Sequence, residues 1–278
     1  SLRVIGCEHL KKANVKTIVL PETEDKRTLA ATEKILKEGI AKVILVGNEE
    51  AVKKSAAEDG YDISGAQIVD PATSEKTQGY IDKLVELRQK KGMTPEQAKD
   101  ILLNQYLYYG VMMVKMGDAD GMVSGAEHTT ANTIRPALQF VKTKPGATLV
   151  SGAFLMCLNG QLYVFADCAV TPNPTSEQLS EMAVTTAATA RIFGIEPRVA
   201  FLSYGTGESG KGPSVDVVKE AVRLTKEKNV DFAFEGPIQF DAAIDPVVAK
   251  TKLPNSPVAG RANVFIFPEL NTGNCCYK

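Results

Sequence analysis

Short apolar runs alternate with amphipathic stretches along the first half of the chain. Residues 17–20 and 42–46 are two such runs, and the helical pattern between them ends at Gly39. Neighbouring parallel strands need a crossover of about a dozen residues, which an amphipathic helix of this length supplies. A further apolar run at 67–70 and a helix expected at 74–91 continue the pattern. The alternation therefore predicts an α/β fold with a parallel sheet.

The pattern changes near residue 147, where Asn159-Gly160 separates the apolar runs 147–158 and 161–166. Asn-Gly between two apolar runs is a strong signal for a β-hairpin, so this sheet is expected to be mixed. Further elements are expected as a helix from Thr94, strand 121–125, helix 128–141, helix 176–193, strand 198–204, helix 214–229, strand 230–234, helix 245–251 and strand 262–267.

The length of 278 residues is enough for one large or two medium domains. We expect two α/β lobes with mostly parallel sheets, the first formed by residues 1–147 and the second by residues 148–278. Residues 141–146 combine Pro and Gly with a short basic stretch, which is typical of a linker.

The charge balance excludes a global attraction for polyanions. The chain has 32 basic and 33 acidic side chains, so its formal net charge is -1. Neither nucleic acid nor an anionic membrane is an expected partner, and an anionic ligand would need a local cluster of donors. No run of about 18 apolar residues and no leader pattern is found. The five cysteines are scattered along the chain, and there are only two histidines. This pattern is typical of reduced cysteines in a cytoplasmic protein, and no metal site is expected.

A glycine-rich segment, residues 205–212, follows an apolar run and precedes a helical pattern. It satisfies GxGxxG and the first part of a P-loop, both of which bring backbone N–H groups to a phosphate. Gly212 stands where a P-loop needs Ser or Thr, and Asp231 lies at the start rather than the end of the next expected strand. A metal-free phosphate cradle and a ligand-free turn both remain open.

A second junction between a strand and a helix is rich in small donors. Hydroxyls, backbone N–H groups and a guanidinium suit a tetrahedral anion. The alternative is simple N-capping by Thr129 or Thr130, with Arg135 in solvent. His128 has no carboxylate at a motif spacing, so a capping or packing role is favoured over acid–base chemistry. The candidate residues here are Ser124, Gly125, His128, Thr129, Thr130 and Arg135.

A third donor-rich segment follows the last apolar run, and it is expected to be a loop. Open α/β sheets bind ligands at the carboxyl ends of their strands, so three such segments predict a site for phosphate-bearing small molecules. The residues alone do not indicate the reaction. The candidate binding residues of the second lobe are Ser203, Thr206, Asn271, Thr272, Gly273 and Asn274.

Several blocks in register make the chain similar to the phosphate acetyltransferase (phosphotransacetylase) family. They include Leu20-Pro-Glu-Thr-Glu-Asp-Lys-Arg27, Asp120-Gly-Met-Val-Ser-Gly125, Phe165-Ala-Asp-Cys168, Gln239-Phe-Asp-Ala-Ala243 and Ser256-Pro-Val-Ala-Gly260. Residues 172–177, 202–204 and 262–274 add further blocks. The resemblance covers nearly the whole chain.

The resemblance implies reversible transfer of an acetyl group between coenzyme A and inorganic phosphate, directly in a ternary complex. It implies no cofactor, a fold like that of the isocitrate and isopropylmalate dehydrogenases, a site between the lobes and a homodimer. It also implies that Arg88 and Arg135 hold coenzyme A and phosphate, and that Ser124 acts with Arg135 in catalysis.

The chain also departs from the family. Members carry a C-terminal tail with an Asp-Leu-Ser-Arg-Gly-like motif, so we expect both ends of the gene product to lie outside the 278 residues. The glycine-rich segment differs from the family pattern, which leaves the role of Lys211 open. Phosphate butyryltransferase and a non-catalytic acetyl-CoA-sensing domain, as found on some malic enzymes, are the alternatives.

Overall fold

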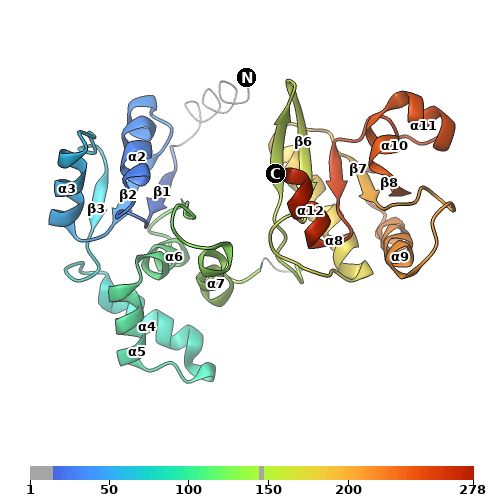
Figure 1. Cartoon of the computed structure of the whole chain (residues 1–278). Helices are drawn as coiled ribbons and strands as arrows, with labels where there is room; N and C mark the ends of the chain where they lie inside the picture. Colours follow the sequence, from blue (N-terminus) through green and yellow to red (C-terminus); the bar gives the residue numbers. More distant parts are fainter. Residues whose placement is uncertain (1–14, 144–146) are drawn as a thin grey trace. The chain divides into compact units, whose positions relative to one another are not determined.

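The computed structural model describes residues 15–143 and 147–278 (Figure 1). The chain divides into two compact units, Ser1–Lys142 and Thr143–Lys278. Part of the predicted linker, residues 144–146, lies outside the described residues, as do Cys7 and His9. Each unit has a β-sheet of its own with hydrophobic clusters on both faces.

The first unit is built on a four-stranded parallel sheet. Its elements are β1 (Thr17–Leu20), α2 (Lys26–Glu38), β2 (Lys42–Val46), α3 (Glu49–Glu58), β3 (Gln67–Val69), α4 (Thr77–Arg88), the 3-10 helix η1 (Gln89–Lys91), α5 (Pro95–Asn104), α6 (Tyr106–Met116), β4 (Gly121–Met122) and α7 (Thr130–Phe140). The strand order is β3-β2-β1-β4. From β1 the chain adds β2 and β3 on one side of the sheet and then returns to add β4 on the other side. The strand order therefore reverses between β1 and β4, and open α/β sheets bind ligands at such a switch point.

Helices cover both faces of this sheet because neighbouring residues of a strand point to opposite sides (Figure 1). Val19 and Ile44 pack in a cluster with residues of α4, α5, α6 and α7. Leu20 and Leu45 pack in a second cluster with residues of α2 and α3. Burial on both faces explains why the strands read as continuous apolar runs. The helix predicted from Thr94 is confirmed by a capping box at the start of α5.

The second unit is built on a five-stranded mixed sheet, ordered β5-β6-β9-β7-β8. Its elements are β5 (Phe154–Leu158), β6 (Gln161–Ala166), α8 (Ser176–Ile192), β7 (Arg198–Leu202), α9 (Pro213–Glu227), β8 (Ala233–Ile238), α10 (Phe240–Ile244), α11 (Pro246–Lys252), β9 (Val264–Ile266) and α12 (Leu270–Tyr277). The predicted hairpin is confirmed, since β5 and β6 pair antiparallel. Asn159 and Gly160 have φ values of 49° and 77°, as the tight turn requires.

The second sheet is also buried on both faces. Val164, Val199 and Val264 pack in a cluster with α8 and α9. Phe165 and Phe265 pack in a cluster on the other face with residues of α10. The predicted fold class, two α/β units with mostly parallel sheets, is therefore confirmed.

Several predicted elements differ from the structure, and three of the differences bear on the site. The strand expected at 230–234 runs from Ala233 to Ile238. Its position 236 needs glycine, because a Cβ there would lie 2.6 Å from the Cβ of Phe201. Residues 271–274, expected in a loop, form part of α12. The strand expected at 121–125 ends at Met122, because the following backbone turns toward β1.

Candidate functional site

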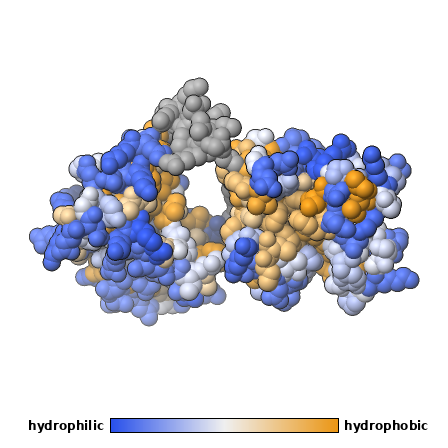
Figure 2. Space-filling model, turned by 45° about the horizontal axis from the view of Figure 1, so that its top comes forward, coloured by the Kyte–Doolittle hydropathy of each residue, from blue (hydrophilic) through white to orange (hydrophobic). Residues whose placement is uncertain are grey.

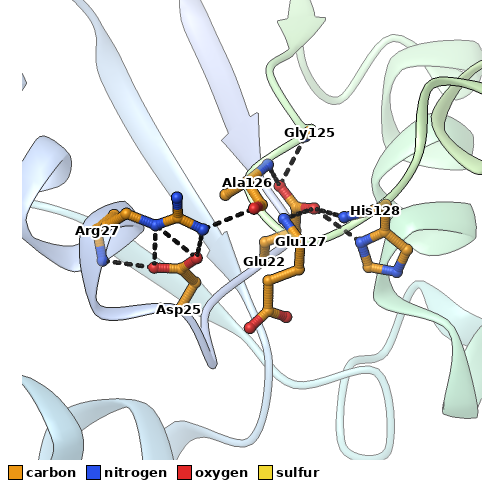
Figure 3. Close-up of polar contacts among 7 residues, drawn as sticks. All are labelled: Glu22, Asp25, Arg27, Gly125, Ala126, Glu127 and His128. Atoms are coloured by element: carbon orange, nitrogen blue, oxygen red, sulfur yellow. Dashed lines mark hydrogen bonds and ion pairs between the residues drawn. The ribbon is translucent and has the colours of Figure 1, made fainter.

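Two chain segments meet at the carboxyl ends of β1 and β4 in the first unit (Figure 3). Val19 of β1 is paired with Met122 of β4, and the N–H of Val123 donates to the Val19 carbonyl at 3.0 Å. Residues 21–27, which follow β1, are thereby held beside residues 124–128, which follow β4. This junction contains one of the three donor-rich segments identified in the sequence.

Glu22 binds the backbone of the segment after β4. Its Oε2 accepts the N–H groups of Gly125 and Ala126 at 2.8 and 2.9 Å. Its Oε1 accepts those of Glu127 and His128 at 3.0 and 2.9 Å. The residue is only 5% exposed. The N–H groups that we assigned to an anionic ligand therefore bind a carboxylate of the chain itself.

His128 binds the same carboxylate through its ring. Its Nδ1 lies 2.7 Å from Oε1 of Glu22. Burial acts to raise the pKa of Glu22, but the His128 side chain and the backbone N–H groups together hold this pKa well below its usual range. An ionised carboxylate has no proton to donate, so Nδ1 of His128 is the donor. The sequence has no carboxylate at a motif spacing from His128, and the partner found in the structure lies 106 residues away in sequence.

The opposite side of the same segment is held by Arg27. Its Nη2 donates to the Ala126 carbonyl at 2.6 Å, and its Nε lies 3.0 and 2.9 Å from the two carboxylate oxygens of Asp25. Hydrogen bonds from Arg27 lower the pKa of Asp25. The side chains of residues 22–27 therefore engage the loop through both its N–H groups and a carbonyl (Figure 3).

A pocket of about 460 Å³ opens beside this loop in the first unit. His128, Asn132 and Arg135 line it from the loop and α7, and Glu22 and Glu24 line it from the segment after β1. The other lining residues are Pro21, Leu103, Asn104, Gln105, Tyr106, Leu107, Tyr108 and Glu127. The structure thus combines a guanidinium and an imidazole in one pocket.

The remaining predicted residues of the first unit have different surroundings. Thr129 caps α7, and its Oγ1 accepts the N–H of Asn132 at 3.3 Å, while Thr130 is the first residue of that helix. Oγ of Ser124 and Nε of Arg88 are buried and have no hydrogen-bond partner among the described residues. Arg88 ends α4 and does not line the pocket of Arg135.

The glycine-rich segment of the second unit is folded on itself. A Cβ on Gly205 would lie 2.5 Å from the Cα of Gly210, so these two backbones approach closely. The N–H of Gly207 donates to the Pro237 carbonyl at 2.9 Å. Thr206 is 7% exposed, and its hydroxyl donates to the side chain of Gln239 at 3.2 Å. These contacts favour the interpretation as a ligand-free turn.

The predicted donors at residues 271–274 belong to α12. The N–H groups of Asn271 and Thr272 both donate to the Glu269 side chain, at 2.7 Å, as in a helix N-cap. Gly273 is buried, and a Cβ there would lie 2.2 Å from the carbonyl oxygen of Asp167. Asn274 donates to the Cys168 carbonyl at 3.0 Å. These residues attach α12 to the end of β6.

A second buried carboxylate follows β6. Asp167 is 3% exposed, and its Oδ1 accepts the N–H groups of Gly152, Ala169 and Val170 at 3.2, 2.7 and 3.0 Å. Its Oδ2 accepts the N–H of Thr171 at 2.8 Å. No role for Glu22 or Asp167 was predicted from the sequence. The available signal is their position directly after a strand, at the edge where ligands bind.

The second unit has a pocket of about 620 Å³ that is lined mainly by apolar side chains. Of the predicted residues, Ser203 and Thr272 line it. Cys276 lines it as well, whereas Cys168 is fully buried, and burial raises the pKa of its thiol to about 12. Cys168 is therefore an inert thiol at neutral pH.

Two features are absent from the described ranges 15–143 and 147–278. No helix there has both the length and the apolar character needed to cross a membrane. No group of three His, Cys, Asp or Glu side chains in these ranges is placed to hold a metal ion.

Comparison with known proteins places the chain in a family. The family model for phosphate acetyl/butaryl transferase matches residues 6–278. Phosphate acetyltransferase of Nitratidesulfovibrio vulgaris is 54% identical over 96% of this chain, which spans 38% of that relative's length. The enzyme of Escherichia coli is 52% identical over 95% of this chain and 37% of its own length. The chain thus spans well under half of these relatives.

Solved structures agree. A phosphotransacetylase from Streptococcus pyogenes has a TM-score of 0.92 at 44% identity, covering 99% of this chain and 84% of its own. The EutD phosphotransacetylase from Staphylococcus aureus has a TM-score of 0.90 at 43% identity, with the same coverage. The chain therefore belongs to the phosphate acetyl/butaryl transferase family.

Proposed function

We propose that the protein is a phosphate acetyltransferase, which moves an acetyl group reversibly between coenzyme A and inorganic phosphate. The observation that carries the proposal is the pocket of the first unit, where Arg135 and His128 lie together. A guanidinium offers a planar fork of donors to phosphate oxygens. The proposal is supported by the relatives of this name, which are up to 54% identical to the chain.

The chemistry needs electrostatic stabilisation more than it needs a cofactor. A phosphate oxygen attacks the thioester carbonyl carbon, the carbon–sulfur bond breaks, and the coenzyme A thiolate leaves and takes up a proton. Acetyl phosphate is the other product. Negative charge develops on the carbonyl oxygen during attack, and donors fixed in advance stabilise it. No bound cofactor or metal ion takes part in the proposed reaction.

In this proposal Arg135 and Ser124 act on the reacting groups. Arg135 lines the pocket, and the buried Oγ of Ser124 has no hydrogen-bond partner among the described residues. We assign Arg88, whose Nε has no hydrogen-bond partner in the part of the chain that the structure describes, to coenzyme A or phosphate. Ser203 and Thr272 are assigned to coenzyme A through the apolar pocket of the second unit.

We further propose a cytoplasmic homodimer without nucleic-acid or membrane partners. Figure 2 shows large apolar areas on the second unit. Exposed apolar patches on a folded protein commonly mark an interface between subunits. The exposed large apolar residues of this unit include Leu158, Ile192, Phe193, Tyr204, Phe240, Ile244 and Val247. Light scattering coupled to gel filtration tests the dimer, and a monomeric mass would contradict it.

The decisive test is phosphate-dependent release of free thiol from acetyl-CoA by the full-length protein. Arg135→Gln is expected to lower kcat by about 100-fold, as loss of one such donor typically does. Arg223→Gln is the matched control, because Arg223 is an exposed arginine of α9 that pairs with Glu220 and Glu227. Binding of acetyl-CoA without any thiol release would indicate an acetyl-CoA-sensing domain instead.

Butyryl-CoA in the same assay tests the second candidate, phosphate butyryltransferase. Butyryl is longer than acetyl by two methylenes, and each methylene in an acyl pocket changes discrimination by about 1 to 3 kcal/mol. We expect a higher kcat/KM with acetyl-CoA, because the relatives at about half identity are named for acetyl transfer. A higher kcat/KM with butyryl-CoA would reverse this assignment.

A further inference from the structure

Glu22 fills the anion site that the backbone of the loop would otherwise offer. Consecutive N–H groups that converge on one point form a concavity that binds anions. Here four such groups, from Gly125 to His128, converge on the Glu22 carboxylate. A phosphate in the neighbouring pocket must therefore be recognised by side chains beyond this carboxylate.

The carboxylate also determines which nitrogen of the His128 ring carries the proton. Nδ1 lies 2.7 Å from Glu22 and donates to it. The other ring nitrogen, Nε2, points away from Glu22 in Figure 3. The side chain is 40% exposed and lines the pocket together with Asn132 and Arg135. In a neutral ring with the proton on Nδ1, Nε2 is a hydrogen-bond acceptor.

An acceptor is unusual in a site for phosphate, because ionised phosphate oxygens only accept. Hydrogen phosphate, however, keeps one P–OH group near neutral pH, and this group donates. Arg135 can donate to the ionised oxygens while Nε2 accepts from the hydroxyl. Sulfate has the same shape and charge but carries no proton at this pH, so it leaves Nε2 without a donor.

We propose that Glu22 is a positioning residue that holds His128 as an acceptor, and that His128 selects a protonated oxyanion, hydrogen phosphate, over sulfate. The inference rests on the proposed function, because it concerns the phosphate of that reaction. The other charged side chains on this pocket are Glu24, Glu127 and Arg135. The two carboxylates are acceptors as well, and they disfavour an anion that has no proton to donate.

Kinetics of the full-length protein at pH 8 test the selectivity. Wild-type protein should bind sulfate, as a competitor of phosphate, at least about tenfold more weakly than phosphate, since one hydrogen bond to a charged group is lost. Glu22→Gln should raise the KM for phosphate by about tenfold or more and reduce this discrimination, leaving the KM for acetyl-CoA unchanged. Glu33→Gln is the matched control, because Glu33 accepts the N–H of Asp62 outside the pocket.

A double-mutant cycle separates positioning of His128 from support of the loop. If Glu22 acts through His128, Glu22→Gln should change phosphate selectivity little in a His128→Gln background. Fully additive effects on selectivity, or equal affinity of the wild type for sulfate and phosphate, would overturn the proposal. Thermal unfolding of each variant shows whether it is folded, and Glu22→Asp offers a second, milder variant.

Nitrogen-15 NMR distinguishes failure of this inference from failure of the proposed function. The signals that disappear in His128→Gln are those of His128. At pH 8 the spectrum should show His128 neutral with the proton on Nδ1, and inorganic phosphate should shift Nε2. If the protein releases no thiol but shows this response, the inference stands and the enzymatic proposal fails. A proton on Nε2, or no response to phosphate, overturns the inference even if thiol is released.

Discussion

The two units use the same device at the end of a strand, with different results. Glu22 after β1 and Asp167 after β6 are both nearly buried, and each accepts four backbone N–H groups. Glu22 also holds an imidazole that lines a pocket. For Asp167 the described hydrogen bonds are all from backbone. A carboxylate clamp thus supports a loop in both units, but only in the first does it orient a side chain toward a site.

The largest effect should come from removing the charge of Asp167. In Asp167→Asn the side-chain NH2 group would replace one carboxylate oxygen and face backbone N–H groups. These buried donors would then have no acceptor. We expect the free energy of unfolding of the second unit to fall by about 3 kcal/mol. Hydrogen exchange followed by mass spectrometry should show that residues 150–171 lose protection while residues 121–130 keep theirs. Lost protection in both regions would mean that the two clamps do not act independently.

A somewhat smaller effect is expected from the helix that covers the second clamp. In Gly273→Ala the new Cβ would meet the Asp167 carbonyl oxygen at 2.2 Å, so α12 or the β6 end must shift. Such overpacking typically costs about 1 to 3 kcal/mol. Chemical denaturation monitored by circular dichroism measures the loss. An unchanged denaturation midpoint would show that α12 adjusts freely and does not support Asp167.

Acid should weaken the first clamp. The folded pKa of Glu22 lies below the unfolded value near 4.5, so the unfolded chain binds this proton more readily. Its contribution to stability is complete above pH 4.5 and is lost as the pH falls toward the folded pKa. Glu22→Gln should remove up to about 1.4 kcal/mol per pH unit from the acid slope of the unfolding free energy. Equal slopes for both proteins below pH 4.5 would contradict an ionised Glu22 in the folded state.

The smallest effect, of opposite sign, is expected at a glycine that belongs to neither clamp. Gly79 lies in α4, and a Cβ there would have open space. Gly79→Ala should raise the free energy of unfolding by about 0.5 to 1 kcal/mol, because alanine loses less backbone entropy. The same denaturation assay provides a reference for Gly273→Ala. A loss of stability here would show that methyl groups are costly wherever they are added.

Local patterns were sufficient to predict most of the fold. The apolar runs of β1 and β2 and the Asn159-Gly160 turn each carry their signal within a few residues. The position of β8 was missed because Gly236 is suited to a strand only through its close approach to Phe201, a contact with another element. Likewise α12 contains Gly273 because a side chain at this position would clash with the carbonyl oxygen of Asp167, which belongs to another element.

The candidate site was predicted only in part for the same reason. Arg135 and His128 lie seven residues apart and share one segment, so sequence reasoning grouped them. Glu22 joins them only because β1 and β4 are neighbours in the sheet. Which strands pair is a property of the whole unit, and a short window of sequence does not contain it.

The distance in sequence between Glu22 and its partners also has a consequence for biosynthesis. The ribosome makes β1 first, but Gly125 to His128 follow more than 100 residues later. Glu22 cannot meet these N–H groups until β4 has emerged and paired with β1. A nascent chain that is stalled before β4 therefore lacks the site, and appearance of the His128–Glu22 contact marks the pairing of β4 with β1 during translation.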